Sequence, residues 1–182
     1  MHFAARTFVA LLSLGLMLQL HAPAADARAC HGASARPTLA NIGQVEHTTL
    51  CLINVQRRAH GLAPLRSNGL LRLAALRHSR DMVAKGYFEH TSRNGSTFVA
   101  RIRRTGYFSH VRFWKAGENI AWGVGSQAPP GAIVRAWMNS PPHRRNILEP
   151  GFRGIGVGIT VGSPRYRGRG ATYTTDFGYR VR

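Results

Sequence analysis

The order of two hydrophobic patterns constrains the fold of this chain more than any other feature of its sequence. Residues 154–161 and 171–179 alternate with a period of two, which predicts two antiparallel strands near the end of the chain. Earlier, residues 46–60 and 68–85 repeat apolar side chains at helical spacing. Helices followed by late strands favour an α+β fold, in which helices pack against a sheet.

Local signals place the boundaries of these elements. Gly61 is a stop signal for the first helix, and Asn68 and Gly86 are preferred residues before and after the second, which therefore ends at Lys85. The other expected elements are a short helix after Ser96-Thr97, a strand over 117–122, a Gly/Pro loop over 123–131, a helix over 132–139, a brief helix from Ser140-Pro141 and a basic loop over 163–170.

The first 27 residues have the pattern of a secretory signal peptide. Basic residues precede a short apolar run, and small residues at Ala25 and Ala27 fit a cleavage site. A lipoprotein acylated at Cys30 is the alternative, which the charge of Arg28 disfavours. No later stretch approaches the roughly 20 apolar residues of a membrane helix. We therefore expect a polar lead-in over 28–45, one domain over 46–182, no transmembrane segment, and a secreted or periplasmic protein.

The two cysteines of the chain, Cys30 and Cys51, are expected to form a disulfide bond, because an exported protein meets oxidising conditions. Closing this loop would stabilise the fold by about 3 kcal/mol in the entropic model. The alternative is that Cys51 is a buried thiol in an apolar helix.

The formal net charge is +18, and only Lys85 and Lys115 are lysines, so arginine carries almost all of the positive charge. Such a field attracts polyanions, which outside the cytoplasm are anionic lipids, cell-wall polymers or lipopolysaccharide. Attraction of this kind does not recognise a particular nucleic-acid sequence, so we expect no sequence-specific nucleic-acid binding. The alternative is a solvated surface whose arginines reflect base composition. We expect a monomer.

Three separated segments carry the candidate site. They are Tyr87-Phe88-Glu89-His90, Gly117-Glu118-Asn119-Ile120-Ala121 and the run from Trp137 to Leu148 that contains His143. Two imidazoles and a carboxylate, His90, His143 and Glu118, could converge as ligands of zinc or another divalent cation. Asn119 and Asn146 are expected to satisfy buried backbone groups around the same cleft.

Each candidate has a plainer interpretation. His90 could be an exposed loop histidine, His143 a capping or packing histidine, and Glu118 a structural carboxylate paired with an arginine. Glu118 could also orient a histidine without binding the metal itself. His78 shares a helix face with Leu71, so we interpret it as a core residue; Trp122, Trp137 and Tyr173 are expected in the core or in a cavity wall.

The three segments resemble those of the CAP superfamily of cysteine-rich secretory, antigen 5 and pathogenesis-related proteins, in its bacterial exported branch. The resemblance runs from about Thr48 to Tyr179. It implies a three-layer α-β-α sandwich with a small central antiparallel sheet, and a cavity holding His90, Glu118 and His143. Many members have a second cavity glutamate near the fourth helix, but this chain has no acidic residue between Glu118 and Glu149. The resemblance therefore implies a weak or water-rich metal site.

These observations favour a non-enzymatic exported binding module for a divalent cation, and the resemblance adds a lipid or another cell-envelope ligand. One alternative is a metal-dependent hydrolase of esters or peptides, but the chain lacks a His-Glu-x-x-His helix and a Gly-x-Ser-x-Gly turn. The other is a protein that binds polyanions through its arginines. No residue is assigned a catalytic role.

Overall fold

The computed structural model describes residues 30–166 and 170–181 of the chain. Its four-stranded sheet has the order β1-β3-β4-β2. The strands are β1 (Arg66–Ser67), β2 (Phe113–Gly123), β3 (Gly154–Val161) and β4 (Ala171–Val181). β2, β4 and β3 are antiparallel neighbours, whereas β1 runs parallel to β3. The α+β fold is confirmed, with the correction that this short parallel strand makes the sheet mixed.

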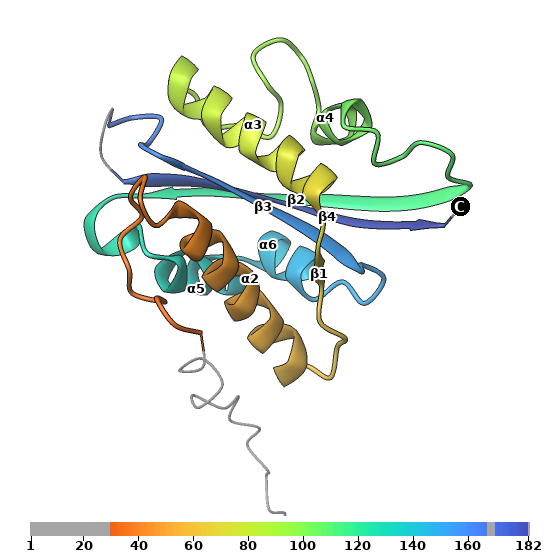
Figure 1. The fold of residues 1–182 in the computed structure, drawn as a ribbon, viewed down its shortest axis with the longest axis horizontal. Coiled ribbons are helices and arrows are strands. Elements are labelled where there is room, and N and C mark those ends of the chain that lie inside the picture. The colour runs from red at the N-terminus through yellow and green to blue at the C-terminus, as the bar shows by residue number, and fades with distance from the viewer. Residues whose placement is uncertain (1–29, 167–169, 182) are drawn as a thin grey trace, which may run out of the picture.

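Helices cover both faces of the sheet (Figure 1). One face carries α3 (Gly69–Lys85) and α4 (Phe98–Arg104), and the other carries α2 (Ile42–Ala59), α5 (Pro130–Asn139) and α6 (Pro141–Ile147). A single 3-10 turn, η1 (Gly125–Gln127), precedes α5. The expected three-layer α-β-α arrangement is therefore present. The predicted signal peptide lies outside the described residues.

The boundaries of α3 follow from its end residues. The Asn68 side chain accepts hydrogen bonds from the backbone N–H groups of Leu70 and Leu71 at 3.0 and 3.1 Å. Gly86 ends the helix with a φ of 65°, a conformation that glycine adopts without steric cost. Both ends agree with the prediction.

Three other elements begin earlier than their sequences indicate, α5 by two residues and α2 and β2 by four. α2 starts at Ile42 rather than 46, after a turn in which the Thr38 N–H donates to the Asn41 side chain at 2.7 Å. β2 starts at Phe113 rather than 117, because its backbone pairs with β4 as far as Val181. Residues 113–115 are exposed, so no buried side chain marks this extension in the sequence.

β3 has two different faces. Ile155, Val157 and Ile159 are buried in the main core, on the side of α2 and α5. Gly156 and Gly158 face α3, where an added Cβ would lie 2.0 and 2.1 Å from helix backbone atoms. The glycines therefore let the α3 backbone lie directly on the sheet.

A disulfide bond joins Cys30 to Cys51, as predicted, and fixes the start of the described chain to α2. The Gly131 N–H also donates to the Ala33 carbonyl at 2.9 Å, which ties the same segment to α5. Within residues 30–166 and 170–181, none of the helices has the length and hydrophobicity needed to cross a bilayer.

The close approach of α3 predicts a large difference between two glycine substitutions. Gly158→Ala should lower the free energy of unfolding by about 3 kcal/mol or more, because rigid helix backbone blocks the new methyl group. Gly154→Ala is the control, since its nearest neighbours lie at 3.5 Å. Urea denaturation of both variants measures the difference, and equal losses would contradict this account of the packing.

Candidate functional site

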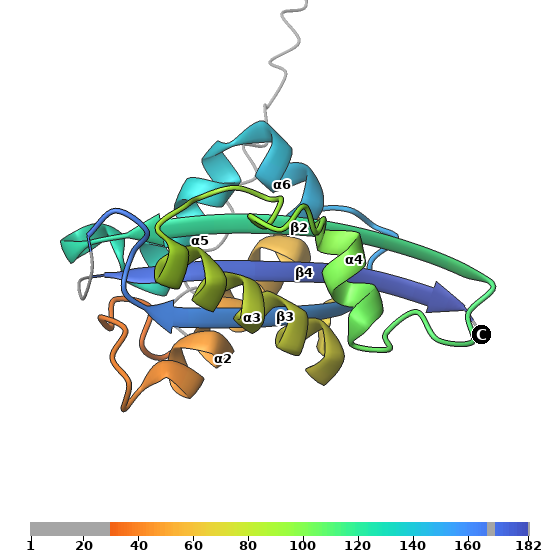
Figure 2. The same cartoon turned by 90° about the horizontal axis from the view of Figure 1, so that it is seen from above.

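The candidate site is built on β2, which forms one edge of the sheet. Successive side chains of a strand point to opposite faces. Ile120 packs with Met82 of α3, while Gly117 lies against Asn146 of α6. Glu118 therefore faces the α3 and α4 side, and Asn119 faces α6. Figure 2 shows the loop that follows α3 running along β2, with α6 next to the same edge.

Glu118 is buried and both of its oxygens have partners. Its side chain is 1% exposed; Oε1 lies 2.8 Å from His90 Nδ1, and Oε2 accepts from Arg101 Nη2 at 2.5 Å. A carboxylate only accepts hydrogen bonds, so the Nδ1 atom of His90 carries the proton. Because the ring of His90 is 53% exposed, this arrangement leaves the Nε2 lone pair for a ligand.

Arg101 also organises the loop that carries His90. Its Nη1 group donates to the carbonyls of His90 and Ser96, both at 2.9 Å, and to the Ser92 hydroxyl at 3.1 Å. Arg101 was not among the predicted site residues. It lies in a run of three arginines with Arg103 and Arg104, and nothing local shows that it alone is buried.

His143 reaches the site from the first turn of α6, behind Pro141 and Pro142. Its Nδ1 atom lies 2.9 Å from the Ser140 hydroxyl. Burial lowers the pKa of His143, and the nearby charge of His90 lowers it further. The two imidazoles are therefore close enough to interact, and His143 favours the neutral form that binds metals.

Two amides fix α6 to β2 beneath the site. Asn119 Nδ2 donates to the His143 carbonyl at 3.1 Å. Asn146 Nδ2 donates to the Glu118 carbonyl at 3.0 Å and to Asn119 Oδ1 at 2.8 Å. These contacts hold the backbone of both candidate residues in place.

A second buried arginine supports α6 from the opposite end. Arg57 of α2 is fully buried and donates to the carbonyls of Ile147 and Glu149 at 2.7 and 3.0 Å. Ile147 is the last residue of α6, so the first of these bonds satisfies a carbonyl that the helix itself leaves free, and the second holds the chain just after the helix. Arg57 was not among the predicted residues.

Asp176 on β4 lies opposite Glu118 in the strand register and is fully buried. Neither of its carboxyl oxygens has a hydrogen-bond partner among the described residues. Burial raises the pKa of Asp176 well above its ordinary value, and the charge of Glu118 adds to this effect. Arg101 pairs with Glu118 rather than with Asp176, so burial favours the uncharged, protonated form of Asp176. The sequence offered one indication of this buried acid, because Asp176 is an acidic residue within an apolar strand.

The remaining predicted residues lie in the core or at its margin. His78 is fully buried, and its Nε2 atom lies 2.9 Å from the Glu89 carbonyl. Trp137 and Tyr173 are buried and donate to the carbonyls of Ile120 and Ala128 at 3.1 and 2.7 Å. Trp122 is half-buried next to Tyr166.

The donor set limits what a metal could find here. Within residues 30–166 and 170–181, no three His, Cys, Asp or Glu side chains form a group that could hold a metal ion. Glu118 uses both oxygens on His90 and Arg101. Among the three expected ligands, this leaves the imidazoles of His90 and His143 as the groups with which a metal could interact.

Comparison with known proteins gives a consistent match. The family model of the cysteine-rich secretory protein family, CAP, matches residues 50–177. The Bacillus subtilis protein YkwD is 38% identical over 118 residues, which are 65% of this chain and 43% of YkwD. The B. subtilis membrane protein YlbC is 36% identical over 63% of this chain and 31% of its own length. The chain thus spans less than half the length of these relatives.

Solved structures show the same fold. An extracellular protein with an SCP domain from Bacillus anthracis superposes with a TM-score of 0.62 and 30% identity, over 79% of this chain and 44% of that protein. An outer surface protein of Borrelia burgdorferi gives a TM-score of 0.60 over 80% of this chain and 96% of that one. Its identity of 20% supports the fold alone.

The buried acid pair predicts an unusual effect of pH on stability. The raised pKa of Asp176 means that the folded state holds a proton which the unfolded state releases above about pH 4, so Asp176 destabilises the fold increasingly as pH rises. Asp176→Asn cannot ionise. Its melting temperature should therefore increase relative to wild type between about pH 4 and pH 8.

Asp81→Asn provides a control of opposite sign. Burial alone would raise the pKa of Asp81, but hydrogen bonds from Lys85 and Tyr87 outweigh burial and lower it. The unfolded state therefore holds the proton more tightly, so Asp81→Asn should lose stability relative to wild type as pH rises toward about pH 4, and its difference from wild type should stay constant from about pH 5 to pH 8. A pH-independent difference for Asp176→Asn would contradict the assignment of the proton to Asp176.

Proposed function

The chain belongs to the CAP family of cysteine-rich secretory proteins, and on this basis we propose that it is an exported, non-enzymatic binding domain whose ligand contacts His90 and His143. The observation that carries the proposal is the state of His90. A buried carboxylate fixes its ring through Nδ1, while half of the ring faces solvent. A histidine held in this way is oriented for binding at Nε2.

Export is supported by three features. The N-terminal residues have the signal-peptide pattern, a disulfide bond joins Cys30 to Cys51, and the related B. anthracis protein is extracellular. We propose a secreted or periplasmic location on these grounds.

A divalent cation such as zinc is the ligand that this chemistry favours. The Nδ1 atoms of both imidazoles have partners, Glu118 for His90 and Ser140 for His143, so each ring has its Nε2 atom left for a metal. Two protein ligands make a weak site, with exchangeable waters in the other positions. Such a site suits reversible binding.

A hydrolase has less support. A carboxylate that acts as general base toward a metal-bound water must have an oxygen to accept the proton, and both oxygens of Glu118 are engaged by His90 and Arg101. Ser92 accepts from Arg101 and is only 8% exposed, so it is a poor nucleophile. The binding role requires neither group to react.

Zinc titration calorimetry tests the proposal. Wild-type protein should bind one zinc ion, and His90→Ala or His143→Ala should each weaken binding at least about tenfold, because each removes one of two protein ligands. The measured quantity is the heat released per mole of zinc, with the same pH and buffer for every variant.

His47→Ala is the matched control, since His47 is exposed on α2, away from the cleft. Its affinity should equal that of wild type. Loss of binding in all three variants to the same degree would indicate scattered surface histidines, and would overturn the assignment of the site. Circular dichroism establishes that each variant is folded.

A further inference from the structure

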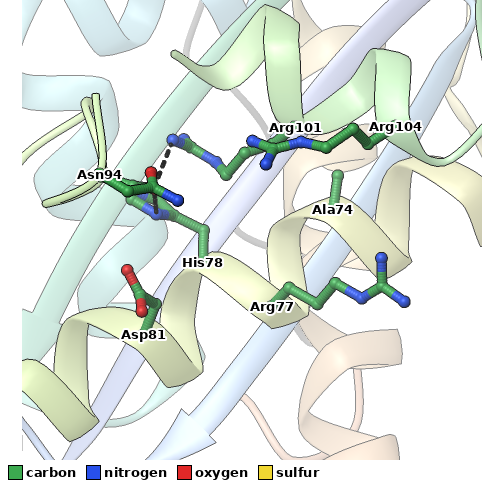
Figure 3. Close-up of a pocket in the computed structure, with 8 residues that line it drawn as sticks. Ala74, Arg77, His78, Asp81, Asn94, Arg101 and Arg104 are labelled. Atoms are coloured by element: carbon green, nitrogen blue, oxygen red, sulfur yellow. Dashed lines mark hydrogen bonds between the residues drawn. The ribbon is translucent and has the colours of Figure 1, made fainter. Parts of the chain in front are cut away.

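A cavity opens between α3 and α4 (Figure 3). Its volume is about 210 Å³. None of His90, Glu118 and His143 lines it. α3 contributes Ala74, Arg77, His78 and Asp81 to its wall, and α4 contributes Arg101 and Arg104.

The floor of this cavity is polar but uncharged apart from Arg101. Ser92 accepts from Arg101 Nη1 at 3.1 Å and lies 3.4 Å from His78 Nδ1. His78 Nε2 donates to the Glu89 carbonyl, and burial lowers the pKa of His78, which favours the neutral ring. These hydrogen bonds connect Arg101, Ser92 and His78, and none of them involves a carboxylate.

One donor on the floor has no acceptor. Arg101 is 8% exposed, and its Nε–H is buried with no hydrogen-bond partner among the described residues. Its other nitrogens are occupied by Glu118 and the loop. Because this N–H is buried, a ligand in the cavity does not reach it, and the charge that a ligand meets must come from the other arginines of the wall.

The rim carries unbalanced positive charge. Arg77 and Arg104 are exposed, and neither forms an ion pair with a carboxylate in the part of the chain that the structure describes. The one acid that lines the cavity, Asp81, is already bound by Lys85 at 2.7 Å and by the Tyr87 hydroxyl. Two guanidinium charges therefore remain for a ligand.

We propose that this cavity binds the phosphate group of a small phosphate monoester. Such a group carries a charge of about −1.5 to −2 at neutral pH, which balances the free charges of Arg77 and Arg104. Guanidinium groups match the geometry of phosphate oxygens, so Arg77 and Arg104 can each donate charge-assisted hydrogen bonds to the group. The volume is many times the roughly 10–15 Å³ that one water requires, so an esterified group fits as well.

Calorimetry with two probes, glycerol 3-phosphate and inorganic phosphate, tests this site at constant ionic strength. Wild-type protein should bind with one-to-one stoichiometry. Arg77→Gln and Arg104→Gln should each weaken binding about five- to tenfold, as expected when a charge-assisted hydrogen bond is lost. The ratio of the two affinities identifies the source: tighter binding of the ester indicates a phosphorylated molecule, and tighter binding of phosphate indicates the free ion.

Two neighbouring arginines provide matched controls, because each removes the same charge from the same helix outside the cavity. They are Arg80→Gln on α3 and Arg103→Gln on α4, both exposed and neither part of the cavity wall. Each should change affinity less than about twofold, the effect expected of a screened surface charge. Equal weakening by all four variants would show that only the net charge attracts phosphate, and would overturn the proposal. Absence of binding to wild type would do the same.

Discussion

The buried carboxylate of Glu118 holds α4, and the loop between α3 and α4, against β2 at the edge of the sheet. It joins β2 to α4 through Arg101 and to the intervening loop through His90. Removing one member of a buried ion pair typically costs about 3–5 kcal/mol, because the other charge is left without a partner. The Arg101 guanidinium in turn holds three groups of the loop. The position of His90 therefore depends on an interaction that begins in the middle of a strand.

This arrangement places the two proposed sites on either side of the Glu118–Arg101 pair. Glu118 and Arg101 neutralise each other, and the ring of His90 extends from this pair to solvent beside His143. On the other side, Arg101 forms the floor of the cavity between α3 and α4. Imidazoles on one side suit a metal cation, and guanidinium groups on the other suit an anion.

Much of the fold could be predicted from local patterns, because caps and alternation depend on neighbouring residues. Asn68 and Gly86 determine α3, and the alternation at 154–161 is that of a strand with one apolar face. The parallel strand at Arg66–Ser67 could not be predicted, since two exposed residues have no pattern of their own. Likewise, β2 extends to Phe113 only because β4 is there to pair with it.

The candidate site was likewise predictable only in part from the sequence. His90, Glu118 and His143 lie in recognisable motifs, and the structure places His90 against Glu118 and within electrostatic reach of His143. Arg101 and Asp176 were missed because their roles arise from tertiary contacts: one arginine among many turns inward, and one aspartate meets Glu118 across the strand register.

The most direct test of the account is the tautomer of His90 in the wild-type protein. A long-range proton–nitrogen correlation spectrum, recorded at about pH 8.5 where ordinary imidazoles with a pKa of about 6.5 are neutral, identifies which ring nitrogen carries the proton. The account predicts protonated Nδ1 for His90, since Glu118 accepts from it, and the form typical of free histidine, with Nε2 protonated, for exposed His47. Protonated Nε2 in His90 would contradict the claim that Glu118 orients this ring.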